Sequence, residues 1–127
     1  MLIATCVLAA AAAVVHVYIF VLESVRWEAP ATRRVFGTSQ ETASVTRPLA
    51  YNQGFYNLFL AVGTIVGVAL LDGEREAGVA LLVFGLGSML AAAAVLITSD
   101  ISKARAAVVQ GLFPALALLV LLVNSLS

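Results

Sequence analysis

The sequence predicts an all-α integral membrane protein, built as a bundle of four membrane-spanning helices with both termini on the outer side. Only 11% of its 127 residues are charged, less than half the share of about 25% found in soluble domains. Hydrophobic residues make up 62% of the chain and its mean hydropathy is +1.06, so too little polar surface remains to cover a water-soluble globule. Four apolar runs are each long enough to cross about 30 Å of hydrocarbon as a helix.

The four apolar runs fill most of the chain and leave no room for a separate soluble domain. We expect a single domain over residues 1–127, with spans at about 2–22, 49–71, 77–98 and 104–123. The first run has no Lys or Arg before it and no convincing cleavage site after it. We therefore expect a retained helix and not a signal peptide.

The basic residues set the orientation, because the cytoplasmic loops of membrane proteins carry an excess of Lys and Arg. Six of the seven basic residues lie in the segments after the first and third runs: Arg26, Arg33, Arg34, Arg47, Lys103 and Arg105. The opposite side holds the two termini and one basic residue, Arg75. We therefore expect the long first loop in the cytoplasm and the protein in a bacterial inner (plasma) membrane.

The first loop, residues 24–48, is the only long polar segment of the sequence. Pro30 and Pro48 bracket it, and Gly37 marks a turn within it. Residues 38–41, Thr-Ser-Gln-Glu, match a capping box, in which a hydroxyl and a carboxylate satisfy the free amides of a helix start. A helix is therefore expected to begin near this point.

Small residues on the second and third runs predict close helix packing, because membrane helices associate through backbone approach and interhelical hydrogen bonds. Gly63 and Gly67 form a GxxxG pair in the second run. Pro114 lies inside the fourth run, where it removes one backbone hydrogen bond and predicts a kink. The pattern fits both a tight bundle of one chain and a homo-oligomer, a dimer or a trimer, and the sequence does not separate them.

Polar side chains inside a bilayer are costly, so each one is a candidate functional residue. His16, Glu23 and Trp27 follow a helical spacing and share one face of the first run. We assign His16 and Glu23 as candidate catalytic residues, because an intramembrane His and Glu can act as an acid–base pair. Trp27 and a polar group from the second and fourth runs form the candidate ligand-binding set: Trp27, Asn52, Gln53, Tyr56, Asn57 and Gln110.

These residues all lie in the cytoplasmic half, which predicts a polar chamber between the helices that opens toward the cytoplasmic leaflet. Each also has a structural interpretation. Glu23 could reach water or pair with Arg26, and His16 could be a hydrogen-bonded core residue. Trp27 is typical of the aromatic belt at a membrane boundary, and the amide side chains could form a purely structural network.

Several function classes are excluded by residues that the chain lacks. A single cysteine, Cys6, rules out a disulfide scaffold, and seven basic residues balanced by seven acidic ones leave no basic footprint for nucleic acid. One cysteine and one histidine cannot form a structural zinc site. The P-loop, the Rossmann glycine pattern and the nucleophile elbow are absent as well, so the sequence identifies no metal and no cofactor.

Three stretches of the chain are distinctive. They are His16–Glu23 with Trp27, the triplet Val35-Phe36-Gly37, and residues 52–61, Asn-Gln-Gly-Phe-Tyr-Asn-Leu-Phe-Leu-Ala. Through them the chain resembles a widespread family of small four-span membrane proteins from bacteria and fungi, whose function is unknown. The resemblance covers nearly the whole chain, implies the four-span topology and supplies no activity.

The order of features is also similar to that of the MAPEG superfamily, membrane-associated proteins in eicosanoid and glutathione metabolism. Its members are four-helix proteins, usually trimeric, with termini outside and a long cytoplasmic first loop. Their second helix opens with an Arg and an Asn-Asp-x-Glu segment that helps to bind glutathione. Arg47 and Asn52 correspond to that Arg and Asn, whereas Gln53 and Phe55 stand where the family has Asp and Glu. The resemblance is a guide to the fold and to the location of a site.

These observations favour a small membrane enzyme or binding protein that acts on a lipophilic small molecule entering from the bilayer. Acid–base isomerisation, cyclisation or epoxide opening suits His16 and Glu23, and thiol conjugation suits the MAPEG resemblance. Two other classes stay open. One is a non-catalytic scaffold or accessory membrane subunit, and the other is a small transporter, although the outer half carries few polar residues.

Overall fold

The computed structural model describes residues 2–126. The elements in chain order are α1 (Leu2–Phe20), the π-helical turn η1 (Val21–Val25), α2 (Pro30–Phe36), α3 (Gln40–Leu70), α4 (Arg75–Ser99), the 3-10 turn η2 (Ile101–Lys103) and α5 (Ala104–Leu126). Four helical segments are long and apolar enough to span a membrane: α1 with η1, α3, α4, and η2 with α5. The predicted all-α bundle of an integral membrane protein is therefore confirmed.

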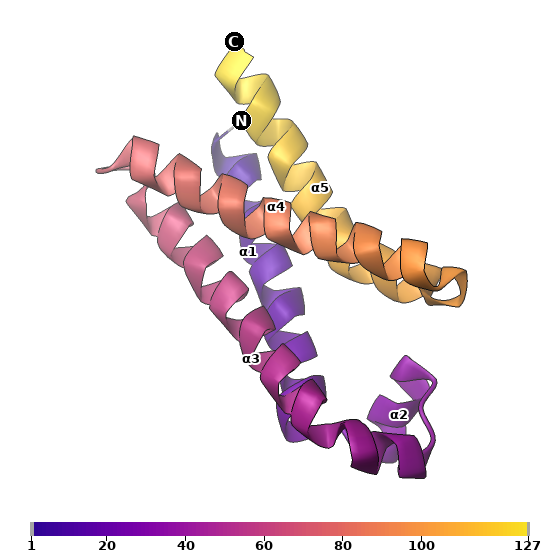
Figure 1. Cartoon of the computed structure of the whole chain (residues 1–127). Coiled ribbons are helices and arrows are strands. Elements are labelled where there is room, and N and C mark those ends of the chain that lie inside the picture. Colours follow the sequence, from indigo (N-terminus) through magenta and orange to yellow (C-terminus); the bar gives the residue numbers. More distant parts are fainter. Residues whose placement is uncertain (1, 127) are drawn as a thin grey trace.

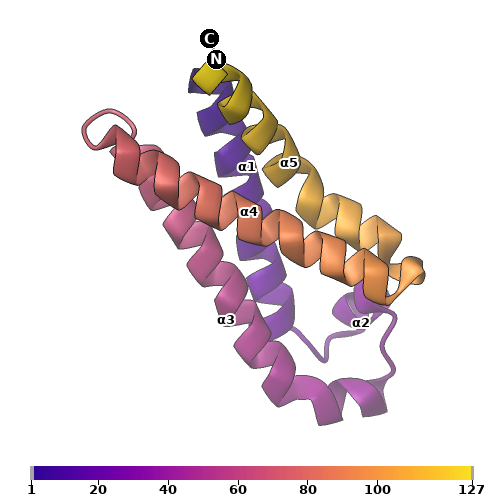
Figure 2. The same cartoon turned by 45° about the horizontal axis from the view of Figure 1, so that its top comes forward.

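The four long helices pack in a ring, in which α1 and α4 each contact both α3 and α5 (Figure 1). α3 and α4 meet at the turn that joins them and diverge toward their other ends, as both views show (Figures 1 and 2). The two chain ends lie together at one end of the bundle, called here the terminal end (Figure 2). The opposite end holds η1, α2 and η2 and is called the polar end.

The hydrophobic core lies toward the terminal end. Leu82, Leu86 and Met89 of α4 are fully buried there and belong to one cluster with alanines of α1 and α5, including Ala12 and Ala117. The small side chains let the backbone of α5 come close to those of α1 and α4, and such close packing is what stabilises helix association in lipid. This core holds the four helices together at the terminal end. At the polar end they are joined by hydrogen bonds, which are described below.

Gly67 and Gly78 form the crossing of α3 and α4 near their joining turn. A methyl group added at Gly78 would lie 2.8 Å from the Gly67 carbonyl oxygen, so the two backbones can approach this closely only with glycine. Gly63, by contrast, has open space beside it. The GxxxG sequence therefore does not act as a pair within the chain, because only Gly67 packs against another helix.

The first loop contains more helix than the sequence indicates. α3 begins at Gln40, and its N-cap is Ser39 rather than Thr38: the Ser39 hydroxyl accepts a 3.1 Å hydrogen bond from the Thr42 amide. The expected boundary at Pro48 is wrong, because Pro48 lies inside α3, whose first turns run at an angle to the rest (Figure 1). Proline removes one backbone donor from a helix, and contacts with the end of α1, described below, offset that loss.

The fourth apolar run begins with η2 and continues as α5, which remains helical through Pro114. The Asp100 carboxylate caps η2 by accepting hydrogen bonds from the Ser102 hydroxyl at 2.7 Å and from the Ser102 amide at 3.0 Å. These bonds hold the pKa of the Asp100 carboxyl below its usual value. Because the pKa is lowered in the folded state, the stabilisation is present at neutral pH and is lost as the pH falls into the acid range.

α2 is a short helix that is fixed at its C-terminal end. Gly37 ends it in the left-handed conformation (φ 64°), which glycine adopts without steric cost. The Lys103 ammonium donates a 2.6 Å hydrogen bond to the Phe36 carbonyl, at the helix end where the dipole favours a cation. The Phe36 ring packs against Trp27 with ring centroids 5.0 Å apart. α2 thus joins the end of α1 to the turn between α4 and α5.

Replacing Lys103 with methionine is expected to loosen α2 without disturbing the spanning helices. The change removes the ammonium from the Phe36 carbonyl and keeps most of the apolar stem, so the free energy of opening α2 should fall by about 1 kcal/mol. Hydrogen exchange of the amides in residues 33–38 should speed up severalfold. Arg105→Met, which removes a nearby charge, is the control, and equal exchange in the two variants would contradict the capping role.

Candidate functional site

The end of α1 is a π-helical turn that directs consecutive residues toward α3. The Arg26 amide donates a 2.9 Å hydrogen bond to the Val21 carbonyl, so the turn is one residue wider than an α-helical turn. Glu23 and Ser24 both bond to groups of α3. The wider turn makes the angle between consecutive side chains somewhat smaller than the roughly 100° of a regular helix, and both side chains bond to α3.

Glu23 lies within the spanning segment of α1 and is bound by a neutral amide. Its Oε2 accepts a 3.1 Å hydrogen bond from the Asn57 side chain, whereas Oε1 makes no hydrogen bond to any residue in 2–126. Among those residues the one ion pair joins Arg47 and Glu28, at 3.4 Å on the surface, so Glu23 is not paired with Arg26. The carboxylate therefore keeps one oxygen available for a ligand or a proton.

His16 is deeply buried, with 1% of its surface exposed. Its Nδ1 lies 2.9 Å from the Ala12 carbonyl oxygen, and because a carbonyl only accepts, Nδ1 carries the proton. In the neutral ring the lone pair is then on Nε2. His16 and Glu23 are seven positions apart, about 10 Å along a helix, and no hydrogen bond joins them in the described chain. The two candidate catalytic residues are thus on one helix and not in contact.

Ser24 and Trp27 bind the end of α1 to the first half of α3. The Ser24 hydroxyl donates a 2.7 Å hydrogen bond to the Tyr51 carbonyl. The indole nitrogen of Trp27 donates to the Ala43 carbonyl at 3.1 Å and to the Thr46 hydroxyl at 3.2 Å. Trp27 is half-buried at this junction. Because its indole nitrogen is already bonded to α3, Trp27 would contact a ligand through the carbon atoms of its ring.

The other candidate ligand-binding residues are spread over the polar end. Asn57 reaches Glu23 and also donates a 3.2 Å bond to the Gln53 carbonyl. Asn52, Gln53 and Tyr56 are exposed on α3, and Gln110 is half-buried on α5. None of these four side chains bonds to Glu23 or His16 in the described residues. The structure thus brings Glu23 and Asn57 together and leaves the remaining candidates apart.

A cavity of about 290 Å³ adjoins Glu23 at the polar end. Its walls come from the end of α1, the following turn and α3: Glu23, Ser24, Val25, Arg26, Trp27, Glu28, Ala29 and Arg47. The lining residues carry two guanidinium groups and two carboxylates. No group of three His, Cys, Asp or Glu side chains in residues 2–126 is arranged to hold a metal ion.

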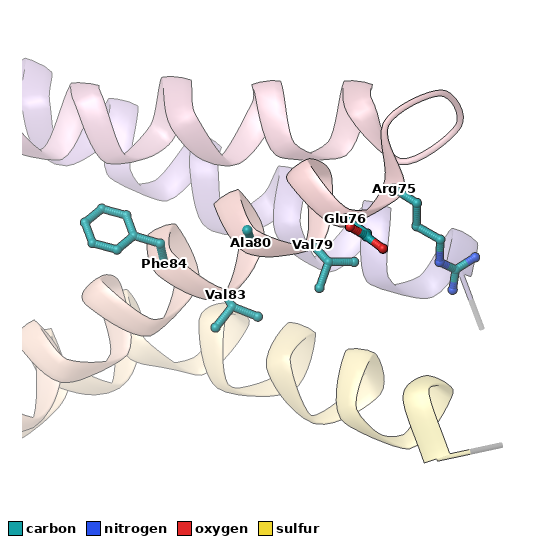
Figure 3. A pocket seen from close by; sticks show the side chains of 6 residues that line it. All are labelled: Arg75, Glu76, Val79, Ala80, Val83 and Phe84. Carbon is teal, nitrogen blue, oxygen red and sulfur yellow. The ribbon is translucent and has the colours of Figure 1, made fainter.

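A larger hollow of about 690 Å³ lies on the first turns of α4, and Figure 3 shows the side chains that line it. All six lining residues come from α4 itself: Arg75, Glu76, Val79, Ala80, Val83 and Phe84. A hollow lined by one helix is an open groove on its surface, and its apolar walls suit lipid chains. Its size therefore does not make it the functional site, and the polar cavity at Glu23 is the better candidate.

Two features of the site do not follow from the polar residues of the sequence. The first is Ser24, which packs directly against Gly54 of α3: a methyl group added at Gly54 would overlap the Ser24 hydroxyl. The only hint of this contact in the sequence is that both residues are small. The other is a cluster of four aromatic rings, in which the Phe55 centroid lies 5.0–6.2 Å from those of Phe20, Tyr51 and Phe59. The i, i+4 spacing of its three α3 members was a usable signal for this cluster.

Four helices of spanning length and an intramembrane carboxylate beside a charged cavity define an integral membrane protein with a polar site at one end of its bundle. Residues 5–122 match the family described as "Protein of unknown function (DUF1304)", and the chain belongs to that family. The predicted resemblance to an uncharacterised family is confirmed. Searches of curated proteins and of solved structures found no match. The resemblance to MAPEG proteins is not shown by these comparisons and stays a prediction.

Proposed function

We propose that this protein is a small membrane enzyme or binding protein that acts on a lipophilic small molecule at Glu23, on the cytoplasmic side of the membrane. The observation that carries the proposal is the position of the Glu23 carboxylate and its single hydrogen-bond partner among residues 2–126. It lies inside a spanning segment, is held by the neutral Asn57 amide at 3.1 Å, and adjoins a cavity of about 290 Å³. Ionisable groups at such positions are costly, so they are kept where they serve a site.

The chemistry that suits this arrangement is proton transfer. Asn57 fixes Oε2, so Oε1 is the atom that would take a proton from a ligand or give one to it. Isomerisation, cyclisation and epoxide opening can each use such a group, and conjugation to a thiol can use one to accept the thiol proton. His16 would act deeper in the bundle through Nε2, because Nδ1 is already bonded to Ala12.

A second candidate, a non-catalytic scaffold or accessory subunit, is favoured by one specific observation. The hydrogen bonds of Glu23, Ser24 and Trp27 all join the end of α1 to α3. A protein that needed only a rigid bundle would use the same bonds, because polar contacts between helices stabilise them in lipid. The two candidates differ in whether a ligand occupies the cavity.

Native mass spectrometry of the protein, purified gently from its own membranes, separates these candidates. We expect a homo-oligomer, a dimer or a trimer, that retains a lipophilic molecule, and we expect Glu23→Leu to lose that molecule. Thr98→Ala on α4, an exposed polar residue away from the cavity, is the control and should retain it. A ligand-free monomer, or a stoichiometric complex with another protein, would contradict the proposal and support the accessory subunit.

A further inference from the structure

The cavity beside Glu23 carries charges of both signs. Arg26 and Arg47 supply two guanidinium groups, and Glu23 and Glu28 supply two carboxylates. Arg47 and Glu28 pair with each other at 3.4 Å, while the Arg26 guanidinium makes no hydrogen bond or ion pair within residues 2–126. A ligand that is only anionic would meet both carboxylates, and one that is only cationic would meet both guanidinium groups. The lining is therefore complementary to a zwitterion.

An aromatic stripe leads from this cavity into the membrane. Arg47, Tyr51, Phe55 and Phe59 are spaced four residues apart on α3, so each lies one turn beyond the last. The Tyr51 and Phe55 rings are 5.0 Å apart, those of Phe55 and Phe59 are 6.2 Å apart, and Phe20 of α1 packs edge-on against Phe55 at 5.1 Å. Tyr51 and Phe59 are more than half exposed. The stripe thus offers apolar surface to lipid directly beside the cavity.

The size of the cavity and the length of the aromatic stripe together indicate the shape of the ligand. A volume of about 290 Å³ is at the lower limit for a small-molecule site, so it holds a headgroup and excludes long chains. From Tyr51 to Phe59 the rings extend about 12 Å along α3, which is most of the depth of one leaflet of the hydrocarbon. The arrangement fits an amphiphile with a compact zwitterionic head and an acyl chain that follows the rings.

We propose that the cavity and the aromatic stripe bind one phospholipid with a primary ammonium headgroup, such as phosphatidylethanolamine. Its phosphate would lie between Arg26 and Arg47, its ammonium would donate hydrogen bonds to Glu28 and to Oε1 of Glu23, and one acyl chain would follow Tyr51, Phe55 and Phe59. Guanidinium groups bind phosphate through paired hydrogen bonds, and a primary ammonium has three donors for carboxylates. The inference names the ligand class of the proposed site and rests on the proposed function.

Lipid titration of the delipidated protein, followed by native mass spectrometry in detergent, tests this proposal. The probes are phosphatidylethanolamine, phosphatidylcholine and phosphatidylglycerol with identical acyl chains. We expect phosphatidylethanolamine to bind about tenfold more tightly than either of the others, because loss of one charged hydrogen bond costs about that much affinity. Phosphatidylcholine has no ammonium donors, and phosphatidylglycerol has no cation for the carboxylates.

The matched variants are Arg26→Gln with Arg47→Gln, against Arg105→Gln as control. The double variant should lose at least about tenfold in affinity for phosphatidylethanolamine, whereas Arg105, at the start of α5 and outside the cavity, should change it less than about twofold. Phe55→Ala should weaken binding and leave the headgroup preference unchanged.

Equal binding of the three lipids, or tighter binding of phosphatidylglycerol, would overturn the proposal. So would a second copy of the chain that covers the stripe and excludes lipid from it. If the protein retains a lipophile other than a phospholipid at Glu23, the proposed function stands and this ligand assignment fails. If it retains no lipophile and binds none of the probes, both fail.

Discussion

Replacing Gly54 with leucine is expected to separate α1 from α3 at the polar end and to lower the free energy of unfolding by about 3 kcal/mol or more. A methyl group at Gly54 would overlap the Ser24 hydroxyl and would lie 2.9 Å from the Ser24 amide nitrogen. The backbone of η1 would therefore have to move. That movement would break the bonds from Ser24 to the Tyr51 carbonyl and from Asn57 to Glu23.

The effect of Gly54→Leu can be measured with the intrinsic fluorescence of the protein. Trp27 is the only tryptophan, and its indole nitrogen bonds to Ala43 and Thr46 of α3, so its emission reports on this junction. We expect red-shifted emission in the folded variant and a lower thermal midpoint. Gly63→Leu is the control, because Gly63 has open space beside it. If both variants behaved alike, close approach at Gly54 would not be what holds the two helices together.

The sequence was sufficient to predict the spanning helices because lipid imposes one solution on an apolar run of that length. All backbone polar groups must be bonded within the segment, and a helix does this without help from tertiary contacts. The same reasoning explains the weaker result for the first loop. Local preference places a boundary at Pro48, whereas α3 extends through Pro48 to Gln40, and its first turns are held by the bonds of Trp27 to Ala43 and Thr46.

The candidate site was predictable in its membership and less so in its geometry. Polar residue type and depth indicated Glu23 and Asn57, which are in contact at 3.1 Å. Ser24 lies in the π turn, which has no residue signature, and its hydroxyl bonds to the Tyr51 carbonyl of α3. The separation of His16 and Glu23 follows from the sequence, because seven positions along one helix correspond to about 10 Å. Two residues on one face of a helix are therefore not in contact at this spacing.

The largest expected effect on activity is that of Glu23→Gln. Glutamine keeps a carbonyl oxygen that can accept the Asn57 hydrogen bond, so the free energy of unfolding should change by less than about 1 kcal/mol. The new amide can neither take nor release a proton, so the rate of any step that uses Glu23 as acid or base should fall by about 10²–10⁴-fold. The measurement is turnover of the lipophile that the purified protein retains, beside the thermal midpoint of the same sample.

Glu23→Leu separates a proton-transfer role from a structural one. Leucine removes the carboxylate that accepts from Asn57 and leaves that half-buried amide with only its bond to the Gln53 carbonyl, which should cost about 1–3 kcal/mol of stability. An enzyme would then lose activity in both variants and stability in only the leucine one. A scaffold would tolerate glutamine fully, because its only requirement is the bond from α3 to α1. If Glu23→Gln lowered the stability as much as Glu23→Leu does, the charge of Glu23 would be needed to hold the fold together. The proposal of acid–base chemistry at this residue would then fail.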